Sequence, residues 1–315
     1  MEYPIKPSPP ATATHNFCDT IAIVKKLRAF LIFLIIILIA AVTVLSINLV
    51  KKNQKTAEIV SPLANLSEKG TIAGISTKSA SPTASPSATP SKKVSTVSGN
   101  LKIALLGDSM VDTFLYDPKI FKVELTKVWP AVNFEILNYG VGATNAEYGF
   151  TRLTQSYDYQ GKTVPSLLSQ NPNIVIVESF AYNHPQELSQ NTQTLSQIIS
   201  TIQSGSKAKI YFLVSIAPDK KIYAQGIEGI TWTPEQRSIE AQKVIDFLRD
   251  AVAFAQNQGL PLINAYQKSL DWEGDGNQEY ISEDNIHPSE AGKLLIADLI
   301  VEKFQTTQII EKLLK

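Results

Sequence analysis

The sequence predicts an α/β fold with three layers around a central parallel five-stranded sheet in the part of the chain after residue 100. From Leu101 onward, short apolar segments rich in Val, Ile and Leu alternate with segments of helical periodicity. Continuously apolar strands are typical of parallel sheets that helices cover on both faces, and the alternating order favours three layers. The expected strands are Leu101–Leu106, Phe134–Leu137, Ile174–Val177, Ile210–Val214 and Leu260–Ile263.

Two of the expected helices have clear starting points. One begins at Thr233-Pro234-Glu235-Gln236, which has the form of a capping box with proline at the first helical position, and it stops at Gly259. The other is expected to open at His287-Pro288. The residues expected to face the core are Val244, Leu248, Val252 and Ala255 of the first helix and Ala291, Leu294, Leu295, Leu299 and Ile300 of the second.

Composition excludes several classes of function. Among the 315 residues, 29 Lys and Arg balance 29 Asp and Glu, and the domain has no basic cluster interleaved with aromatic residues, so nucleic-acid binding is not expected. The only cysteine is Cys18, so no intrachain disulfide can form. No cofactor or metal is expected either. The acidic segment 271–279 lacks the ligand spacing of a calcium loop and is interpreted as a solvated loop.

Residues 29–50 form an apolar run that is interrupted only by Thr43, Ser46 and Asn48. A helix of this length spans the hydrocarbon core of a membrane. A buried core helix would show a polar face, and a cleaved signal peptide would have a shorter apolar region followed by a small-residue cleavage site. We therefore expect one uncleaved transmembrane helix, a signal anchor, after an N-terminal cytoplasmic tail of residues 1–28.

The segment that follows, residues 51–99, is expected to be a disordered linker. Its stretch 76–98 is rich in Ser, Thr, Pro and Ala and has no hydrophobic pattern that would support a fold. Lysines and arginines flank both ends of the apolar run almost equally, so they do not set its orientation. A stalk of this kind favours a domain 100–315 held outside the cytoplasm. A cytoplasmic linker is the alternative.

Four short polar motifs follow expected strands or precede a helix. They are Gly107-Asp108-Ser109-Met110, Asn138-Tyr139-Gly140-Val141-Gly142, Ala181-Tyr182-Asn183-His184 and Asp284-Asn285-Ile286-His287-Pro288. In an open parallel sheet, ligands gather where the carboxyl ends of the strands meet. We therefore expect the four motifs to lie along one edge of the sheet.

The residue types in these motifs suit acyl-ester chemistry. Ser109 is the candidate nucleophile, since a serine hydroxyl becomes reactive beside a base. His287 is the candidate base, and Asp284, three residues earlier, can orient its imidazole. Gly142 and Asn183 are candidate oxyanion donors, through a backbone N–H and a side-chain amide. Each motif also has a simpler interpretation as a turn or a helix cap.

As a set, the motifs resemble those of the SGNH (GDSL-type) hydrolases, over roughly residues 100 to 304. The resemblance implies a flavodoxin-like domain that hydrolyses or transfers ester acyl groups. It also implies a Ser109–His287–Asp284 triad, with the N–H of Ser109, Gly142 and Asn183 as oxyanion donors. The glycine motif is one residue short, so Ala143 is an alternative to Gly142.

A loop from Pro218 to Trp232 leaves the same edge of the sheet. One interpretation is a substrate-binding flap, in which Tyr223 or Trp232 covers a sugar or an acyl chain; the other is that these side chains anchor the loop to the core. His184, next to Asn183, is either a further pocket residue or a surface histidine.

The sequence thus predicts a membrane-anchored serine esterase that acts on O-acyl groups, in particular O-acetyl groups, of cell-envelope glycans. The expected partners are an ester-bearing small molecule or glycan and, through residues 29–50, the membrane. The alternatives are an O-acyltransferase on envelope polysaccharide, a lysophospholipase-like lipid esterase and a catalytically silent glycan-binding module. Activity is expected to fall on acidification, because protonated His287 cannot accept the serine proton.

Overall fold

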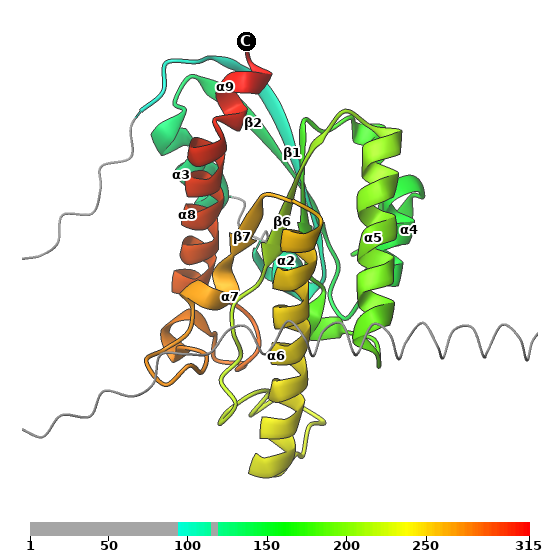
Figure 1. Cartoon of the computed structure of the whole chain (residues 1–315), viewed down its shortest axis with the longest axis vertical. Coiled ribbons are helices and arrows are strands. Elements are labelled where there is room, and N and C mark those ends of the chain that lie inside the picture. Colours follow the sequence, from blue (N-terminus) through cyan, green and yellow to red (C-terminus); the bar gives the residue numbers. More distant parts are fainter. Residues whose placement is uncertain (1–93, 115–118) are drawn as a thin grey trace, which may run out of the picture. The chain divides into compact units, whose positions relative to one another are not determined.

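Five parallel strands form the central sheet of the protein (Figure 1), in a computed structural model that describes residues 94–114 and 119–315. The order across the sheet is β2-β1-β5-β6-β7, and every neighbouring pair is parallel. The strands are β1 (Gly99–Gly107), β2 (Val132–Gly140), β5 (Ile174–Glu178), β6 (Lys209–Val214) and β7 (Leu262–Asn264). The predicted parallel five-stranded sheet is confirmed.

Helices cover both faces of this sheet (Figure 1). On one face lie α3 (Lys119–Val128), α8 (Glu290–Thr307) and α9 (Ile309–Leu313); on the other lie α4 (Ala146–Thr154), α5 (Leu188–Gly205) and α6 (Pro234–Asn257). The shorter elements are α2 (Ser109–Phe114), α7 (Ala265–Lys268) and the 3-10 turns η1 (Leu168–Gln170), η2 (Ala181–Asn183) and η3 (Gln278–Tyr280).

A hydrophobic cluster lies on each face of the sheet, and alternating side chains of β1 contribute to both clusters. Ile103 and Leu105 pack with Trp129 and Phe304 on one face, whereas Leu106 belongs to the cluster on the other face. Successive strand residues point to opposite faces, so a strand that is apolar at every position must be covered twice. The middle strand of the sheet, β5, is buried at every position, which leaves chemistry to the strand ends.

The predicted start of α6 is confirmed, whereas the predicted start of β7 is not. The capping box is confirmed: Thr233 accepts a hydrogen bond from the N–H of Gln236, whose side chain bonds back to the N–H of Thr233. Strand β7 starts at Leu262, two residues later than predicted. Proline has no N–H to donate to a ladder, and Pro261 contributes only its carbonyl, to the N–H of Phe212.

The start and the buried face of α8 differ from the prediction. The helix begins at Glu290 with Ser289 as its cap, because the Ser289 hydroxyl accepts the N–H of Gly292. Pro288 instead pairs with Ile281 in an isolated bridge. The buried stripe includes Ile296 and Ile300 but not Leu294, which is 42% exposed. The helix carries more apolar residues than one face can bury, so periodicity alone does not fix that face.

The structure also contains a β-hairpin that the sequence analysis did not predict. Strands β3 (Tyr157–Tyr159) and β4 (Lys162–Val164) pair antiparallel around Gln160 and Gly161. Both turn residues have positive φ, 50° and 73°, as a tight type I′ hairpin turn requires. The Tyr139 hydroxyl donates to Pro165 O at 2.8 Å, which ties the chain after the hairpin to the carboxyl end of β2.

The predicted tail (1–28), transmembrane helix (29–50) and most of the linker (51–99) lie outside the described residues. Within residues 94–114 and 119–315, no helix is both long and apolar enough to cross a membrane.

Candidate active site

Ser109 lies at the point where β1 passes into α2. The buried carboxyl of Asp108 accepts the N–H of Met110 at 2.9 Å, so Asp108 serves as the cap of this turn. Ser109 is partly exposed between two buried neighbours, and its Oγ forms no hydrogen bond within the described residues. The fold therefore presents this hydroxyl at the surface and leaves it unused.

A close approach of two backbones sets the position of this turn. A Cβ at Gly140, the last residue of β2, would overlap the backbone of Asp112 in α2. Only glycine allows the end of β2 to lie this close to the helix. The carbonyl of Gly107 accepts the N–H of Val141 at 3.2 Å and Arg152 Nη2 at 3.0 Å. The carboxyl ends of β1 and β2 are thus held together beside Ser109.

His287 and Asp284 form a well-defined pair. His287 Nδ1 lies 2.6 Å from Asp284 Oδ2. The other carboxylate oxygen, Oδ1, accepts the Ser282 hydroxyl at 2.6 Å and the N–H groups of Ile286 and His287 at 2.9 Å. Partial burial alone would raise the pKa of Asp284, but these hydrogen bonds hold the pKa well below its usual value. Asp284 therefore stays ionised and orients the imidazole.

The structure distinguishes the two candidate backbone donors near Ser109. A Cβ on Gly142 would lie 4.0 Å from Ser109 Cβ, so this loop borders the nucleophile. However, Gly142 gives its N–H to Asp112 Oδ2 at 3.2 Å and to Tyr159 OH at 3.4 Å. The N–H of Ala143, whose φ is 55°, forms no hydrogen bond within the described residues. Ala143 is thus the residue with a free N–H.

Asn183 lies in the turn after β5 and reaches the nucleophile turn. Its Nδ2 donates to Asp108 Oδ2 at 3.0 Å. A primary amide carries two N–H groups, so one remains for a substrate oxygen. This contact fixes the amide next to Ser109.

Three buried charged groups lie beneath the turn. Burial raises the pKa of Asp108, while the hydrogen bonds from Asn183 and Met110 and the charges of His287 and Arg152 oppose the rise. Burial, followed by the charge of Asp108, raises the pKa of Glu178 well above its ordinary value. Burial lowers the pKa of Arg152, whose guanidinium also lies 5.2 Å from the centre of the Tyr148 ring.

The candidate residues therefore come together at the carboxyl ends of the strands. Asn183 contacts Asp108, and Gly142 borders Ser109. No hydrogen bond joins Ser109 Oγ to His287 in the described chain. Such bonds commonly tighten only when substrate binds. The arrangement suits proton transfer to and from a serine.

Comparison with known proteins identifies the family. The model for the GDSL-like lipase/acylhydrolase family matches residues 103–300. The chain belongs to this family. It is accordingly an enzyme that hydrolyses ester bonds.

Several solved structures are similar to this GDSL-family chain. A lipase/acylhydrolase from Enterococcus faecalis is 18% identical, with a TM-score of 0.48 over 66% of this chain and 96% of that chain. An acetyl xylan esterase is 13% identical, with a TM-score of 0.46 over 64% and 98%. A mutant acetyl-xylooligosaccharide esterase from Geobacillus is 14% identical, with a TM-score of 0.45 over 66% and 94%. The search of curated proteins gave no match.

The loop between β6 and α6 of this GDSL-family domain packs as an anchored segment. Tyr223 is 7% exposed, its ring stacks on Trp232 with centres 6.2 Å apart, and both residues belong to the core cluster that includes α6. Arg237 donates to the carbonyl oxygens of both residues at 3.1 Å. This packing agrees with the anchoring interpretation, and contact of either side chain with substrate stays a prediction.

The anchored loop also supports the histidine segment. Ala224 gives its N–H to Asn285 O at 3.1 Å, and Asn285 Nδ2 donates to Gln225 O at 2.8 Å.

His184 stacks on Phe247 of α6, with ring centres 4.2 Å apart and planes 13° apart, and its Nδ1 lies 2.8 Å from Pro185 O. His184 is therefore held against the helix, and its contact with substrate stays a prediction.

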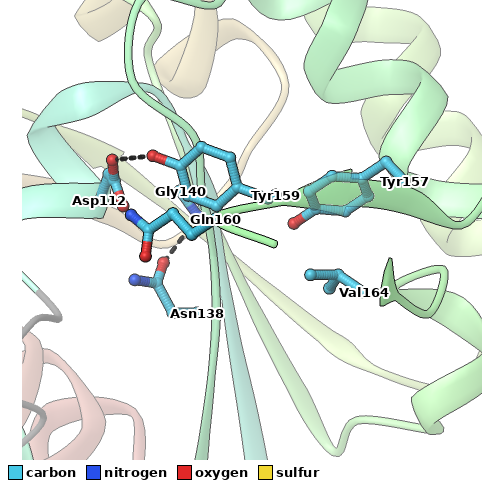
Figure 2. A pocket seen from close by; sticks show the side chains of 7 residues that line it. All are labelled: Asp112, Asn138, Gly140, Tyr157, Tyr159, Gln160 and Val164. Carbon is cyan, nitrogen blue, oxygen red and sulfur yellow. Dashed lines mark hydrogen bonds between the residues drawn. The ribbon is translucent and has the colours of Figure 1, made fainter. Parts of the chain in front are cut away.

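Two residues beside the loop of Gly142, Asp112 and Tyr159, were not predicted from the sequence; their side chains hydrogen-bond to each other (Figure 2). Asp112 lies three residues after Ser109, on the same short helix, and that spacing was the only available signal. Nothing in the sequence indicated that a hairpin would bring Tyr159 to it.

The described residues contain no group of three or more His, Cys, Asp or Glu side chains arranged to hold a metal ion. In the acidic segment, Asp271 Oδ1 accepts the N–H groups of Glu273 and Asp275, and Asp275 Oδ1 accepts that of Lys220. These carboxylates organise the backbone of their own loop.

Proposed function

We propose that this GDSL-family enzyme is a serine esterase in which Ser109, His287 and Asp284 form the catalytic triad. The observation that carries the proposal is the 2.6 Å contact between His287 Nδ1 and Asp284 Oδ2, in a chain whose Ser109 hydroxyl has no hydrogen-bond partner among the described residues. Asp284 fixes the proton on Nδ1, which leaves Nε2 as the proton acceptor.

The reaction has two half-reactions. Ser109 Oγ attacks the ester carbonyl carbon and gives its proton to His287 Nε2. The tetrahedral intermediate then collapses, the C–O bond to the alcohol breaks, and His287 returns the proton to the departing oxygen. Water attacks the acyl-serine in the same way, giving one proton to His287, and the carboxylic acid leaves as Ser109 recovers its proton.

The developing oxyanion needs fixed donors. We assign this role to the free N–H of Ala143, the second amide N–H of Asn183 and the N–H of Ser109. Ala143 is assigned this role in place of Gly142, because the N–H of Gly142 donates to a carboxylate oxygen of Asp112 at 3.2 Å. Loss of one oxyanion donor lowers turnover by about 10²–10³.

The substrate class we propose is the O-acyl esters, in particular O-acetyl esters, of cell-envelope glycans. The support comes from sequence: the apolar run 29–50 is long enough for a membrane anchor, and the Ser/Thr/Pro-rich segment that follows suits a stalk. In this proposal the N-terminus is cytoplasmic and the catalytic domain is extracytoplasmic. Acyl transfer to a sugar hydroxyl uses the same triad and is the second candidate.

The test measures hydrolysis of p-nitrophenyl acetate and release of acetate from O-acetylated oligosaccharides by the full-length chain. Replacement of Ser109 by alanine is expected to abolish both activities while the thermal unfolding transition is retained. A fully active Ser109→Ala variant would overturn the assigned nucleophile. Product analysis with and without an acceptor sugar separates hydrolysis from transfer.

A further inference from the structure

A cavity of about 220 Å³ lies beside the nucleophile turn (Figure 2). It lies between α2, the carboxyl end of β2 and the hairpin β3–β4, and Asn138 and Gln160 of its lining are exposed. Its lining residues are Asp112, Asn138, Gly140, Tyr157, Tyr159, Gln160 and Val164. None of these residues belongs to the proposed triad or to the oxyanion donors, so the cavity is a separate feature next to them.

The cavity is connected to the reacting serine through one residue. Gly142 donates to Asp112 Oδ2 at 3.2 Å and to Tyr159 OH at 3.4 Å, and a Cβ on the same glycine would lie 4.0 Å from Ser109 Cβ. A group bound in the cavity would therefore be separated from the nucleophile only by Gly142. The alcohol or the acyl part of an ester bound at Ser109 could extend into this space.

The polar atoms of the cavity have spare hydrogen-bonding capacity. Asp112 Oδ2 accepts Tyr159 OH at 2.5 Å, whereas Asp112 Oδ1 accepts no hydrogen bond within residues 94–114 and 119–315. Asn138 Oδ1 accepts the N–H of Gly140 at 2.7 Å, and Asn138 Nδ2 has no partner in the same ranges. One free acceptor and one free donor thus line a space that two tyrosine rings also border (Figure 2).

This lining is a poor match for an acyl chain. Val164 is the only aliphatic side chain among the lining residues, and an alkyl group bound there would satisfy neither Asp112 Oδ1 nor Asn138 Nδ2. A phosphate would meet the charge of Asp112. A neutral ring that carries several hydroxyls satisfies donor and acceptor together, and tyrosine rings offer apolar faces to it.

We propose that this cavity is a subsite for a single sugar ring, the one that carries the ester or its neighbour in the glycan. Asp112 and Asn138 bind its hydroxyls, and Tyr159 holds Asp112 in place. The size of the cavity suits one ring and not a longer ligand, because its volume of about 220 Å³ is below the ~300–1,000 Å³ of sites for drug-sized ligands. This inference rests on the proposed function and assigns the residues that bind the sugar of its substrate.

The hairpin provides matched variants for a test. Residues directly opposite each other in β3 and β4 share a face, and that face alternates along the strands. Tyr159 and Val164 line the cavity, whereas Asp158 and Thr163 form a pair on the other face and hydrogen-bond to each other at 2.6 Å. Asn138→Ala and Tyr159→Phe are the test variants, and Thr163→Val is the control that removes a hydroxyl outside the cavity.

The experiment compares kcat/KM for an O-acetylated β-1,4-linked oligosaccharide with kcat/KM for p-nitrophenyl acetate, using the full-length chain. Each test variant is expected to lower the ratio of the two values about 10-fold or more, because Asn138→Ala removes a group that binds a sugar hydroxyl and Tyr159→Phe removes the hydrogen bond that holds Asp112. Thr163→Val is expected to leave the ratio unchanged. An unchanged ratio in both test variants, or faster cleavage of a lysophospholipid than of the glycan ester by the wild type, would overturn the subsite.

A binding measurement separates this inference from the proposed function. If the wild type cleaves no ester, the proposed function fails, and the subsite is then tested by calorimetric titration of the unacetylated oligosaccharide. Binding that weakens about 10-fold in Asn138→Ala supports the subsite. Absence of binding to the wild type, or equal binding to the variant, contradicts it.

Discussion

Replacement of Asp284 by asparagine isolates the role of one carboxylate oxygen. Asp284 Oδ1 accepts three hydrogen bonds, from the Ser282 hydroxyl and the N–H groups of Ile286 and His287, and the amide oxygen of asparagine can accept the same three. Only the Oδ2 contact with His287 Nδ1, at 2.6 Å, changes its chemistry. The loop is therefore expected to keep its conformation.

The catalytic effect is expected to be large. An amide NH₂ at this position faces Nδ1 as a donor, so His287 must carry its proton on Nε2, where it cannot accept the proton of Ser109. In a serine triad this change of tautomer lowers kcat about 10⁴-fold, which corresponds to about 5.4 kcal/mol in the activation free energy.

The assay is the steady-state hydrolysis of p-nitrophenyl acetate, together with thermal unfolding of the same samples. Ser282→Ala is the matched control, because it removes one donor to Asp284 and leaves the contact with His287 intact; its kcat is expected to stay within about 10-fold of the wild type. If folded Asp284→Asn keeps more than about a tenth of the wild-type kcat, Asp284 is not the orienting residue.

Three further predictions concern neighbouring groups. Asn183→Ala removes an oxyanion donor and the partner of Asp108 Oδ2, so kcat for p-nitrophenyl acetate is expected to fall about 10²–10³-fold with little change in KM; an unchanged kcat would exclude the amide from the site. The hydrogen bonds that lower the pKa of Asp284 stabilise the fold above the unfolded-state pKa of about 3.9, and this stabilisation is lost as the pH falls through the lower folded-state pKa. Acid unfolding, followed by circular dichroism, should therefore depend on pH more steeply in the wild type than in Asp284→Asn, and parallel curves would contradict the assignment. Burial and Asp108 raise the pKa of Glu178, so stability should decline as the pH rises through that raised pKa, and Glu178→Gln should remove this part of the decline; equal pH profiles of the melting temperature would count against it.

Much of the fold could be predicted because residues 103–106 of β1 and 174–177 of β5 are continuously apolar, which only a strand covered on both faces explains. The site could be located because parallel strands bring their carboxyl ends to one edge. The sequence could not show that Asp112 occupies the N–H of Gly142, since that contact depends on how closely β2 approaches α2.

The hairpin was missed for a different reason. Its strands have three residues each and carry a tyrosine–aspartate–tyrosine sequence and a lysine–threonine–valine sequence, which are too short for a periodic signal. The Gln160-Gly161 turn was the one local indication. The face of α8 could not be derived either, because Leu294 and Leu295 offer apolar side chains on neighbouring positions and tertiary packing buries others.

Covalent labelling of the nucleophile tests the central claim most directly. A p-nitrophenyl phosphonate ester phosphonylates an activated serine and releases p-nitrophenol, and mass spectrometry of the digested protein locates the adduct. One adduct is predicted, on Ser109, and it should be absent from Ser109→Ala and form much more slowly in His287→Ala. An active wild-type enzyme that carries the adduct on another residue, or an equal rate of labelling in His287→Ala, would contradict the assigned serine and base.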